Sequence, residues 1–437
     1  MLVSPHLERV LNIVGKKFEL ADTATLSNRN EQRAIANEFV SEALDTIAAE
    51  RARAFLPPID SDEEIRIADE VLATLFGLGP LEKLLADNTV ENISVNGCDT
   101  VWVHRADGSK QKADAIATSD EELVALICRA AARLGRNERR FDVANPFLDL
   151  QLPDRSRLNA VMAVSERPAI SIRRHRHQRT SLKELCTLGA FSDSLRDFFD
   201  AVVRARMSII IAGGTNAGKT TLLRALLNAC EPNERLITIE DRLELALSSD
   251  PQRHGDVIEL ETRTANIEGS GEINMQQLVR NALAMSPDRL IIGEVRGAEV
   301  VDMLAALSTG NDGSMCTIHA NSSQAAFSKI ATYALRSAER LPVEATNRMI
   351  AESINFVVHI GQVGGAGRRV LSVREVIGTT HGAVESVEIA TASGSSLAHP
   401  CGELQADTVQ RLYEQGFNPA LCGWSTSSTY SNSQEAA

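Results

Sequence analysis

Residues 213–220, with the sequence GGTNAGKT, constrain the fold more than any other part of the chain. They match the pattern G-x-x-x-x-G-K-[ST], in which glycines let the backbone curl until several N–H groups point at the oxygens of a phosphate. The apolar run SIIIA comes directly before them, and leucines at helical spacing follow from Leu222 to Leu227. A strand, a glycine-rich turn and a helix N-terminus in this order predict a phosphate-binding loop.

The positions of this loop have different predicted tasks. Lys219 is expected to contact the β- and γ-phosphates of a nucleotide, and the Thr220 hydroxyl is expected to bind Mg²⁺. Asn216 stands where glycine is frequent, and asparagine tolerates left-handed backbone geometry better than most residues. The residues predicted to bind the nucleotide are Gly213, Gly214, Thr215, Asn216, Ala217, Gly218, Lys219, Thr220 and Thr221. The predicted ligands are therefore ATP and Mg²⁺.

The pattern around the loop predicts an α/β domain. Short β-branched runs alternate there with helical segments, which is typical of a largely parallel sheet. The predicted strands are 209–212, 236–239, 290–293, 315–318 and 356–360.

The 437 residues are too many for one ordinary domain of roughly 150 residues. Residues 1–55 predict a polar helical extension, which ends at the break Leu56-Pro57-Pro58, and residues 56–180 predict a smaller α+β domain. The α/β domain is expected to cover 181–385. A tail over 386–437 follows, and its Ser-rich end is predicted to be disordered.

Composition excludes several classes of protein. Charged residues make up 24% of the chain, as in soluble globular proteins, and no run approaches the ~18 apolar residues that a membrane-spanning helix needs. Glu8 and Arg9 lie where the apolar core of a signal peptide would be. The net charge of −13 disfavours nucleic acid as a partner, because phosphate neutralisation drives such binding. The cysteines include no C-x-x-C pair, so the sequence predicts no zinc or dithiol site. Scattered cysteines of this kind are typical of a reduced compartment, and we therefore expect a cytoplasmic location.

Glu294 is the candidate for a catalytic carboxylate. It follows LIIG at 290–293, at the carboxyl edge of a predicted strand, where open α/β sheets bind ligands. A carboxylate in this place can position water and help to hold Mg²⁺. From the residues alone, an ion pair between Glu294 and the nearby Arg296 is the alternative explanation.

Four segments together resemble the secretion and pilus-assembly ATPases of types II and IV. Besides the phosphate loop, they are TIEDRLE at 238–244, GEVRG at 293–297 and GSMCTIHAN at 313–321. These three are similar to the acidic box, the Walker B segment and the histidine box of that family. The likeness covers roughly residues 60–385 and is greatest to the CpaF-type motors of tight-adherence pilus systems. It implies a RecA-like P-loop ATPase domain preceded by a smaller α+β amino-terminal domain and a helical extension.

The resemblance also implies roles for single residues. Glu240 and Glu244 resemble acidic-box carboxylates that orient water or Mg²⁺, and His319 resembles a histidine that senses the γ-phosphate. Arg157 and Arg173 resemble amino-domain arginines that reach the nucleotide. Without the resemblance, solvated charge at a strand end explains the carboxylates, and a structural role explains the histidine. The predicted catalytic residues are Lys219, Glu240, Glu244, Glu294, His319, Arg157 and Arg173, with Thr220 and Glu294 as ligands of Mg²⁺.

Some features depart from the family pattern or have a second explanation. Asn311 stands where the histidine box commonly opens with histidine, which disfavours a two-histidine mechanism, and Arg155 replaces a usual glycine. The tetracysteine zinc insert of general secretory-pathway motors is absent. The basic stretch 173–179 is open to two further explanations, a nucleic-acid patch or a solvated linker, and its lack of aromatic residues weakens the first.

The function implied by the resemblance is that of a cytoplasmic ATPase that forms a hexameric ring at the inner face of the membrane. Such a ring would work on an inner-membrane platform protein and drive pilus assembly or protein secretion. One alternative is conjugative or type IV secretion of DNA or protein by the same core. Others are a DNA translocase and a nucleotide-gated binding protein with little turnover.

Overall fold

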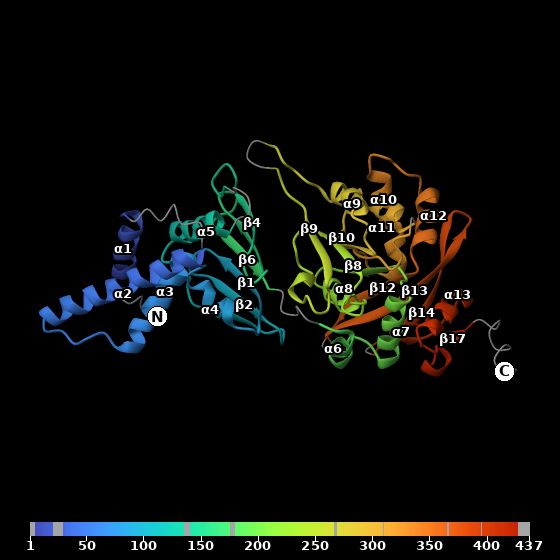
Figure 1. Ribbon diagram of the computed structural model, residues 1–437, viewed down its shortest axis with the longest axis horizontal. Helices are drawn as coiled ribbons and strands as arrows, with labels where there is room; N and C mark the ends of the chain where they lie inside the picture. Colours follow the sequence, from blue (N-terminus) through green and yellow to red (C-terminus); the bar gives the residue numbers. More distant parts are fainter. Residues whose placement is uncertain are drawn as a thin grey trace. The chain divides into compact units, whose positions relative to one another are not determined.

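The chain divides into two compact units, Met1–Arg176 and His177–Ala437 (Figure 1). The computed structural model describes residues 5–20, 29–134, 140–174, 180–265, 269–308, 310–364, 367–394 and 396–426. Most of the Ser-rich end and most of the basic stretch 173–179 lie outside the described residues. Among the described residues, none of the helices combines the length and the apolar character needed to cross a bilayer.

Three helices begin the first unit. They are α1 (Pro5–Leu20), α2 (Arg29–Arg53) and α3 (Ser61–Phe76). Their apolar positions recur at helical spacing and meet in a small core that includes Val14, Val40, Ile47 and Val71. The helical character predicted for residues 1–55 is therefore confirmed within the described part.

A six-stranded antiparallel sheet forms the rest of this unit, in the order β3-β2-β1-β6-β5-β4. The elements are α4 (Leu81–Ala86), β1 (Val90–Asn96), β2 (Val101–Arg105), β3 (Lys110–Ala113), α5 (Asp120–Leu134), β4 (Phe147–Gln151), β5 (Arg157–Val161) and β6 (Ala169–Arg173). Gly97 lies in the turn between β1 and β2 with φ of +75°, a backbone conformation that glycine adopts readily. Leu123 and Ile127 of α5 pack on the core of the sheet.

A nine-stranded sheet organises the second unit, in the order β15-β14-β13-β12-β7-β11-β10-β8-β9. The strands from β12 to β9 are parallel to one another. They are β12 (Phe356–Val363), β7 (Ile209–Gly213), β11 (Met315–His319), β10 (Arg289–Val295), β8 (Arg235–Glu240) and β9 (Asp256–Glu261). The parallel sheet expected from the sequence is thus confirmed, with β9 as an additional edge strand.

Helices cover both faces of this sheet, as Figure 1 shows for α6 and α7 on one side and α9 to α12 on the other. Side chains alternate along β7, so that Ile209 and Ile211 belong to one core while Ile210 and Ala212 belong to the other. The helices are α6 (Leu182–Thr187), α7 (Asp193–Arg204), α8 (Lys219–Leu227), α9 (Met275–Leu283), α10 (Glu299–Leu307), α11 (Ser323–Arg336) and α12 (Val343–Ser353).

The remaining strands and the last helix are β13 (Gly367–Thr380), β14 (Ala383–Thr391), β15 (His399–Pro400), β16 (Glu403–Leu404), α13 (Ala406–Glu414) and β17 (Ser425–Thr426). β13, β14 and β15 extend the sheet antiparallel beyond β12, while β16 and β17 pair in parallel as a separate two-stranded sheet. Leu412, Phe417 and Trp424 belong to the same core as α7 and β7. Residues after 385 are therefore part of the packed unit up to the last described residue.

Candidate functional site

Four neighbouring strands bring predicted site residues to one edge of the sheet. In the order β7-β11-β10-β8, the carboxyl ends carry the phosphate loop, His319, Glu294 and Glu240. Because parallel strands all end on the same side, residues far apart in the sequence converge there. The order of the strands, which the sequence does not reveal, decides which residues are neighbours.

The phosphate loop leaves β7 at Gly213 and enters α8 at Lys219. Gly213 has no room for a side chain, because a Cβ there would lie 2.5 Å from the carbonyl oxygen of Ile360 in β12. Asn216 and Gly218 adopt φ of +60° and +97°. Asn216 thus adopts the left-handed backbone geometry that asparagine tolerates better than most residues.

Lys219 is almost completely buried and points back into the loop. Its Nζ donates hydrogen bonds to the carbonyl oxygens of Gly213 and Gly214, at 3.2 and 2.9 Å. The same Nζ lies 3.3 Å from Nδ1 of His319. The ammonium group is therefore held at the N-terminus of α8, and the helix dipole also favours an anion at this position.

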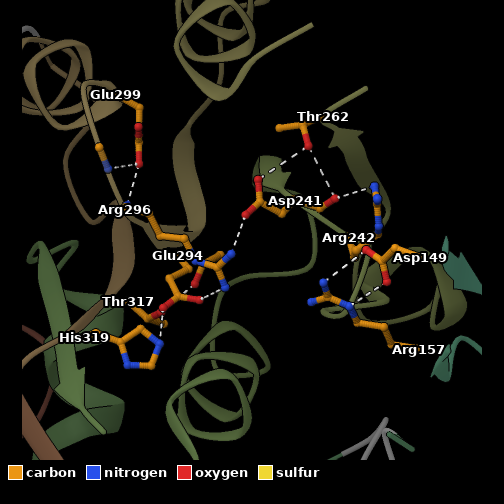
Figure 2. Close-up of polar contacts among 12 residues, drawn as sticks. Asp149, Arg157, Asp241, Arg242, Thr262, Glu294, Arg296, Glu299, Thr317 and His319 are labelled. Atoms are coloured by element: carbon orange, nitrogen blue, oxygen red, sulfur yellow. Dashed lines mark hydrogen bonds and ion pairs between the residues drawn. The ribbon is translucent and has the colours of Figure 1, made fainter. Parts of the chain in front are cut away.

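Glu294 connects His319 with Arg296 (Figure 2). Its Oε1 lies 2.5 Å from His319 Nε2, and its Oε2 accepts a hydrogen bond from Arg296. Burial lowers the pKa of His319, and the cations Lys219 and Arg296 lower it further against the opposing effect of Glu294. A pKa lowered from the ordinary value of 6.5 leaves the imidazole mainly neutral at pH 7.

The ion pair between Glu294 and Arg296, raised as the alternative explanation for Glu294, is present. It does not isolate the carboxylate, because His319 contacts the other oxygen. Arg296 also donates to Asp241 at 2.9 Å, so the polar contacts continue from β10 to the segment after β8 (Figure 2). The geometry therefore joins Lys219, His319, Glu294, Arg296 and Asp241 in one polar chain.

Glu240 is in a different position from Glu294. It is 3% exposed, and its carboxylate accepts hydrogen bonds from the backbone N–H groups of Glu244 and Leu245. Burial, with the nearby Glu244 carboxylate, raises its pKa to about 8. These contacts hold the turn after β8, and Arg224 supports the same turn by donating to the carbonyl of Leu245. Glu244 is half-buried, and the acidic-box roles of both residues stay predictions.

Arg157 and Arg173 lie in the first unit, directly opposite each other in the antiparallel pair of β5 and β6. Arg157 makes two parallel hydrogen bonds to Asp149 of β4, at 3.0 and 3.1 Å (Figure 2). A forked pair of this kind fixes the plane of the guanidinium group. The structure therefore brings the two arginines together on one sheet, and their contact with a nucleotide stays a prediction.

The two departures from the family pattern have simple structural contexts. Arg155 adopts φ of +65° in the turn before β5, the left-handed geometry that suits the glycine usual in the family. Asn311 donates a hydrogen bond to the carbonyl of Ala306, just beyond α10.

Sequence reasoning missed Arg368, which contacts the phosphate loop from β13. Its guanidinium donates to the backbone oxygen and to the side-chain oxygen of Asn216, at 3.0 and 3.1 Å. No signal in the sequence points to this contact, because the pairing of β12 with both β7 and β13 brings the two segments together.

Mg²⁺ would fit this site through oxygen donors and the nucleotide. Among the described residues, no group of three or more His, Cys, Asp or Glu side chains is placed to hold a metal ion. Mg²⁺ commonly keeps several waters and binds one or two protein groups together with substrate phosphates. The Thr220 hydroxyl in the first turn of α8 and the Glu294 carboxylate supply such oxygen donors.

A family model described as "Type II/IV secretion system protein" matches residues 74–379. Over 338 residues, the chain is 37% identical to a Mycobacterium tuberculosis protein whose name assigns it provisionally to conjugal transfer, covering 75% of this chain and 92% of that protein. It is 29% identical over 327 residues to the type IV secretion system protein VirB11 of Brucella suis, covering 68% and 89% of the two chains.

A solved structure of the pilus retraction motor PilT with bound ADP is similar in fold. The TM-score is 0.51 at 18% identity, and the match covers 70% of this chain and 83% of that one. This likeness agrees with the observed architecture, a RecA-like ATPase domain preceded by a smaller amino-terminal domain.

Proposed function

This chain belongs to the type II/IV secretion system protein family, a family of secretion ATPases, and we propose that it is an ATP-hydrolysing ring motor. The ring is a hexamer, and it powers pilus assembly or protein secretion of the tight-adherence, CpaF-like type. It works at the inner face of the cytoplasmic membrane on an inner-membrane platform protein. The observation that carries the proposal is the polar chain from Lys219 through His319 to Glu294 at the carboxyl edge of the sheet.

In the proposed reaction, ATP phosphates enter the loop and Lys219 exchanges its carbonyl contacts for them. The Thr220 hydroxyl and the Glu294 carboxylate would hold Mg²⁺, which would supply charge neutralisation. Glu294 orients the attacking water, and His319 links the phosphate-binding lysine to that carboxylate. Phosphoryl transfer depends mainly on positioning and charge stabilisation, so Arg157 and Arg173 of the first unit add positive charge when it closes on the nucleotide.

Secretion of DNA or protein by a conjugative or type IV system is the second candidate. It is favoured by the names of two relatives, one assigned provisionally to conjugal transfer and one to type IV secretion. The two candidates share the motor and differ in cargo. They therefore differ in which partner stimulates hydrolysis.

The test is the steady-state ATPase rate of purified protein, measured alone, with single-stranded DNA and with membranes that carry the candidate platform protein. Stimulation by those membranes and not by DNA is the expected result. Stimulation by DNA, lost steeply with salt, would favour a DNA-linked motor. Lys219→Ala, which removes the ammonium group from the loop, serves as the control without turnover. If the protein binds ATP but does not hydrolyse it under any of these conditions, the result would favour a nucleotide-gated binding protein.

A further inference from the structure

Arg368 lies against the phosphate loop along its whole side chain. Its stem passes over Gly218, where an added Cβ would lie 3.2 Å from the Arg368 Cδ atom. Its guanidinium then forks to the two oxygens of Asn216, the backbone oxygen at 3.0 Å and Oδ1 at 3.1 Å. Arg368 therefore contacts the loop at both of its positions with positive φ.

The contact with the backbone oxygen of Asn216 controls the orientation of one peptide group. In a trans peptide the C=O and the following N–H point in opposite directions. Fixing the oxygen of Asn216 towards Arg368 thus turns the N–H of Ala217 the other way. In the structure this N–H faces the carbonyl of Gly214 at 3.4 Å, the same carbonyl that Lys219 Nζ contacts at 2.9 Å.

The N–H of Ala217 is consequently directed to the side of the loop where the ammonium group lies. Its 3.4 Å contact is longer than an ordinary N–H···O hydrogen bond, so the donor is available to a stronger acceptor. A phosphate oxygen beside Lys219 would be such an acceptor.

We propose that Arg368 is a positioning residue that holds the phosphate loop ready for a nucleotide. It does so by fixing the peptide between Asn216 and Ala217 with its N–H directed to the phosphates. The proposal rests on the proposed function, because it takes a nucleoside triphosphate as the ligand. A loop that is ordered before binding saves the cost of ordering it on binding, so Arg368 acts on affinity.

The test compares the dissociation constants of ATP and of inorganic tripolyphosphate for wild-type protein and for Arg368→Ala. Both constants are expected to rise by about tenfold, the scale of one lost hydrogen bond from a charged donor. KM for ATP should rise by a similar factor and kcat should change less than about twofold, because the same peptide contacts the phosphates in the ground state and the transition state.

Two further variants separate this role from simple charge. Arg368→Lys keeps the positive charge but cannot fork to two oxygens, so it should recover only a minor part of the affinity. Asn216→Gly tolerates the positive φ and removes only the side-chain acceptor, so its effect should be smaller than that of Arg368→Ala. The double variant should lose less affinity than the two single losses combined, because the two residues share one contact.

Arg348→Ala is the matched control, because Arg348 is an exposed arginine that pairs with Glu352 on α12. The Arg348→Ala protein should bind nucleotide with wild-type affinity. All of the variants should unfold at the temperature of the wild type. Wild-type affinity in Arg368→Ala, or full recovery in Arg368→Lys, would overturn the proposal. If the wild type binds ATP without hydrolysing it, the motor function fails, while the binding comparison still decides the role of Arg368.

Discussion

His319 lies between a cation and an anion, with ring nitrogens 3.3 Å from Lys219 Nζ and 2.5 Å from Glu294 Oε1. Lys219 Nζ also lies 3.4 Å from the other ring nitrogen, Nε2, so the ammonium group contacts both nitrogens of the imidazole. The lowered pKa of His319 keeps the ring mainly neutral at physiological pH. Because His319 contacts both residues, a movement of Lys219 on nucleotide binding would change the surroundings of Glu294 through a single side chain.

Glu240 allows a prediction about pH at the scale of one residue. Its pKa is raised to about 8 by burial and by Glu244, from an ordinary value of 4.5. Between these values the folded protein holds a proton that the unfolded chain releases, so the free energy of unfolding falls as pH rises. Each pKa unit corresponds to about 1.4 kcal/mol, and the expected decline from pH 5 to pH 8 is a few kcal/mol.

Urea unfolding of wild type and Glu240→Gln at pH 5 and pH 8 measures this effect. The glutamine variant cannot titrate and should lose this part of the decline. The exposed Glu403→Gln should behave as the wild type does. Equal pH dependence in wild type and Glu240→Gln would show that Glu240 is ionised in the folded protein throughout this range.

At the scale of elements, the segment after β14 is a structural part of the second unit. Trp424 stacks on Phe198 of α7 with ring centroids 4.4 Å apart, and its Nε1 donates to Ser194. Phe198 also packs against Phe356 of β12, the strand beside β7. The C-terminal segment thus supports the layer beneath the phosphate loop.

Trp424→Ala should therefore destabilise the second unit by about 3–5 kcal/mol, the range for removing a large buried aromatic side chain. Chemical denaturation measures the change. Leu421→Ala is the matched control, because Leu421 is 85% exposed and its loss should change stability by less than about 0.5 kcal/mol. If both variants unfold like the wild type, the packing of Trp424 does not support the fold.

The sequence predicted the strands of the second unit that are continuous apolar runs and missed the edge strand β9. The five predicted strands are all present as β7, β8, β10, β11 and β12, because buried parallel strands read as continuous apolar runs. β9 was missed because DVIELE, at a half-buried sheet edge, mixes three acids with three aliphatics and contains no long apolar run. Residues after 385 were expected to form a tail, because their apolar residues lie in short elements and make no long strand or helix pattern.

The site could be predicted where a motif lies on one strand or loop. Lys219, Glu294 and His319 were named from such motifs, and the structure brings them into contact. The contact of Arg368 with Asn216 could not be predicted, because it depends on strand pairing between residues distant in sequence. The structural setting of Glu240 was missed for a similar reason, since its side chain is buried beside Gly293 of β10, and burial is the largest cause of its raised pKa.

At the scale of the whole molecule, the phosphate loop and the arginines lie in different units with separate cores. We expect turnover to need both. Arg157→Ala should lower kcat by at least about tenfold, because a guanidinium near the transferred phosphate stabilises charge in the transition state. The steady-state ATPase rate at saturating ATP measures this change.

Asp149→Ala is the matched control for that variant, because it breaks the same forked ion pair and keeps the guanidinium. It should retain most of the turnover. Equal losses in the two variants would assign the effect to the stability of the first unit, and no loss in Arg157→Ala would remove this arginine from the reaction.

The most direct test of ATP hydrolysis at this site is a paired measurement of ATP binding and turnover in wild type and Glu294→Gln. Glutamine keeps the size of the side chain and loses the negative charge that orients water. The dissociation constant of ATP should stay within about threefold of the wild type, while kcat should fall by about 100-fold or more. Turnover of Glu294→Gln equal to that of the wild type would contradict the assignment of Glu294 and of the polar chain built around it.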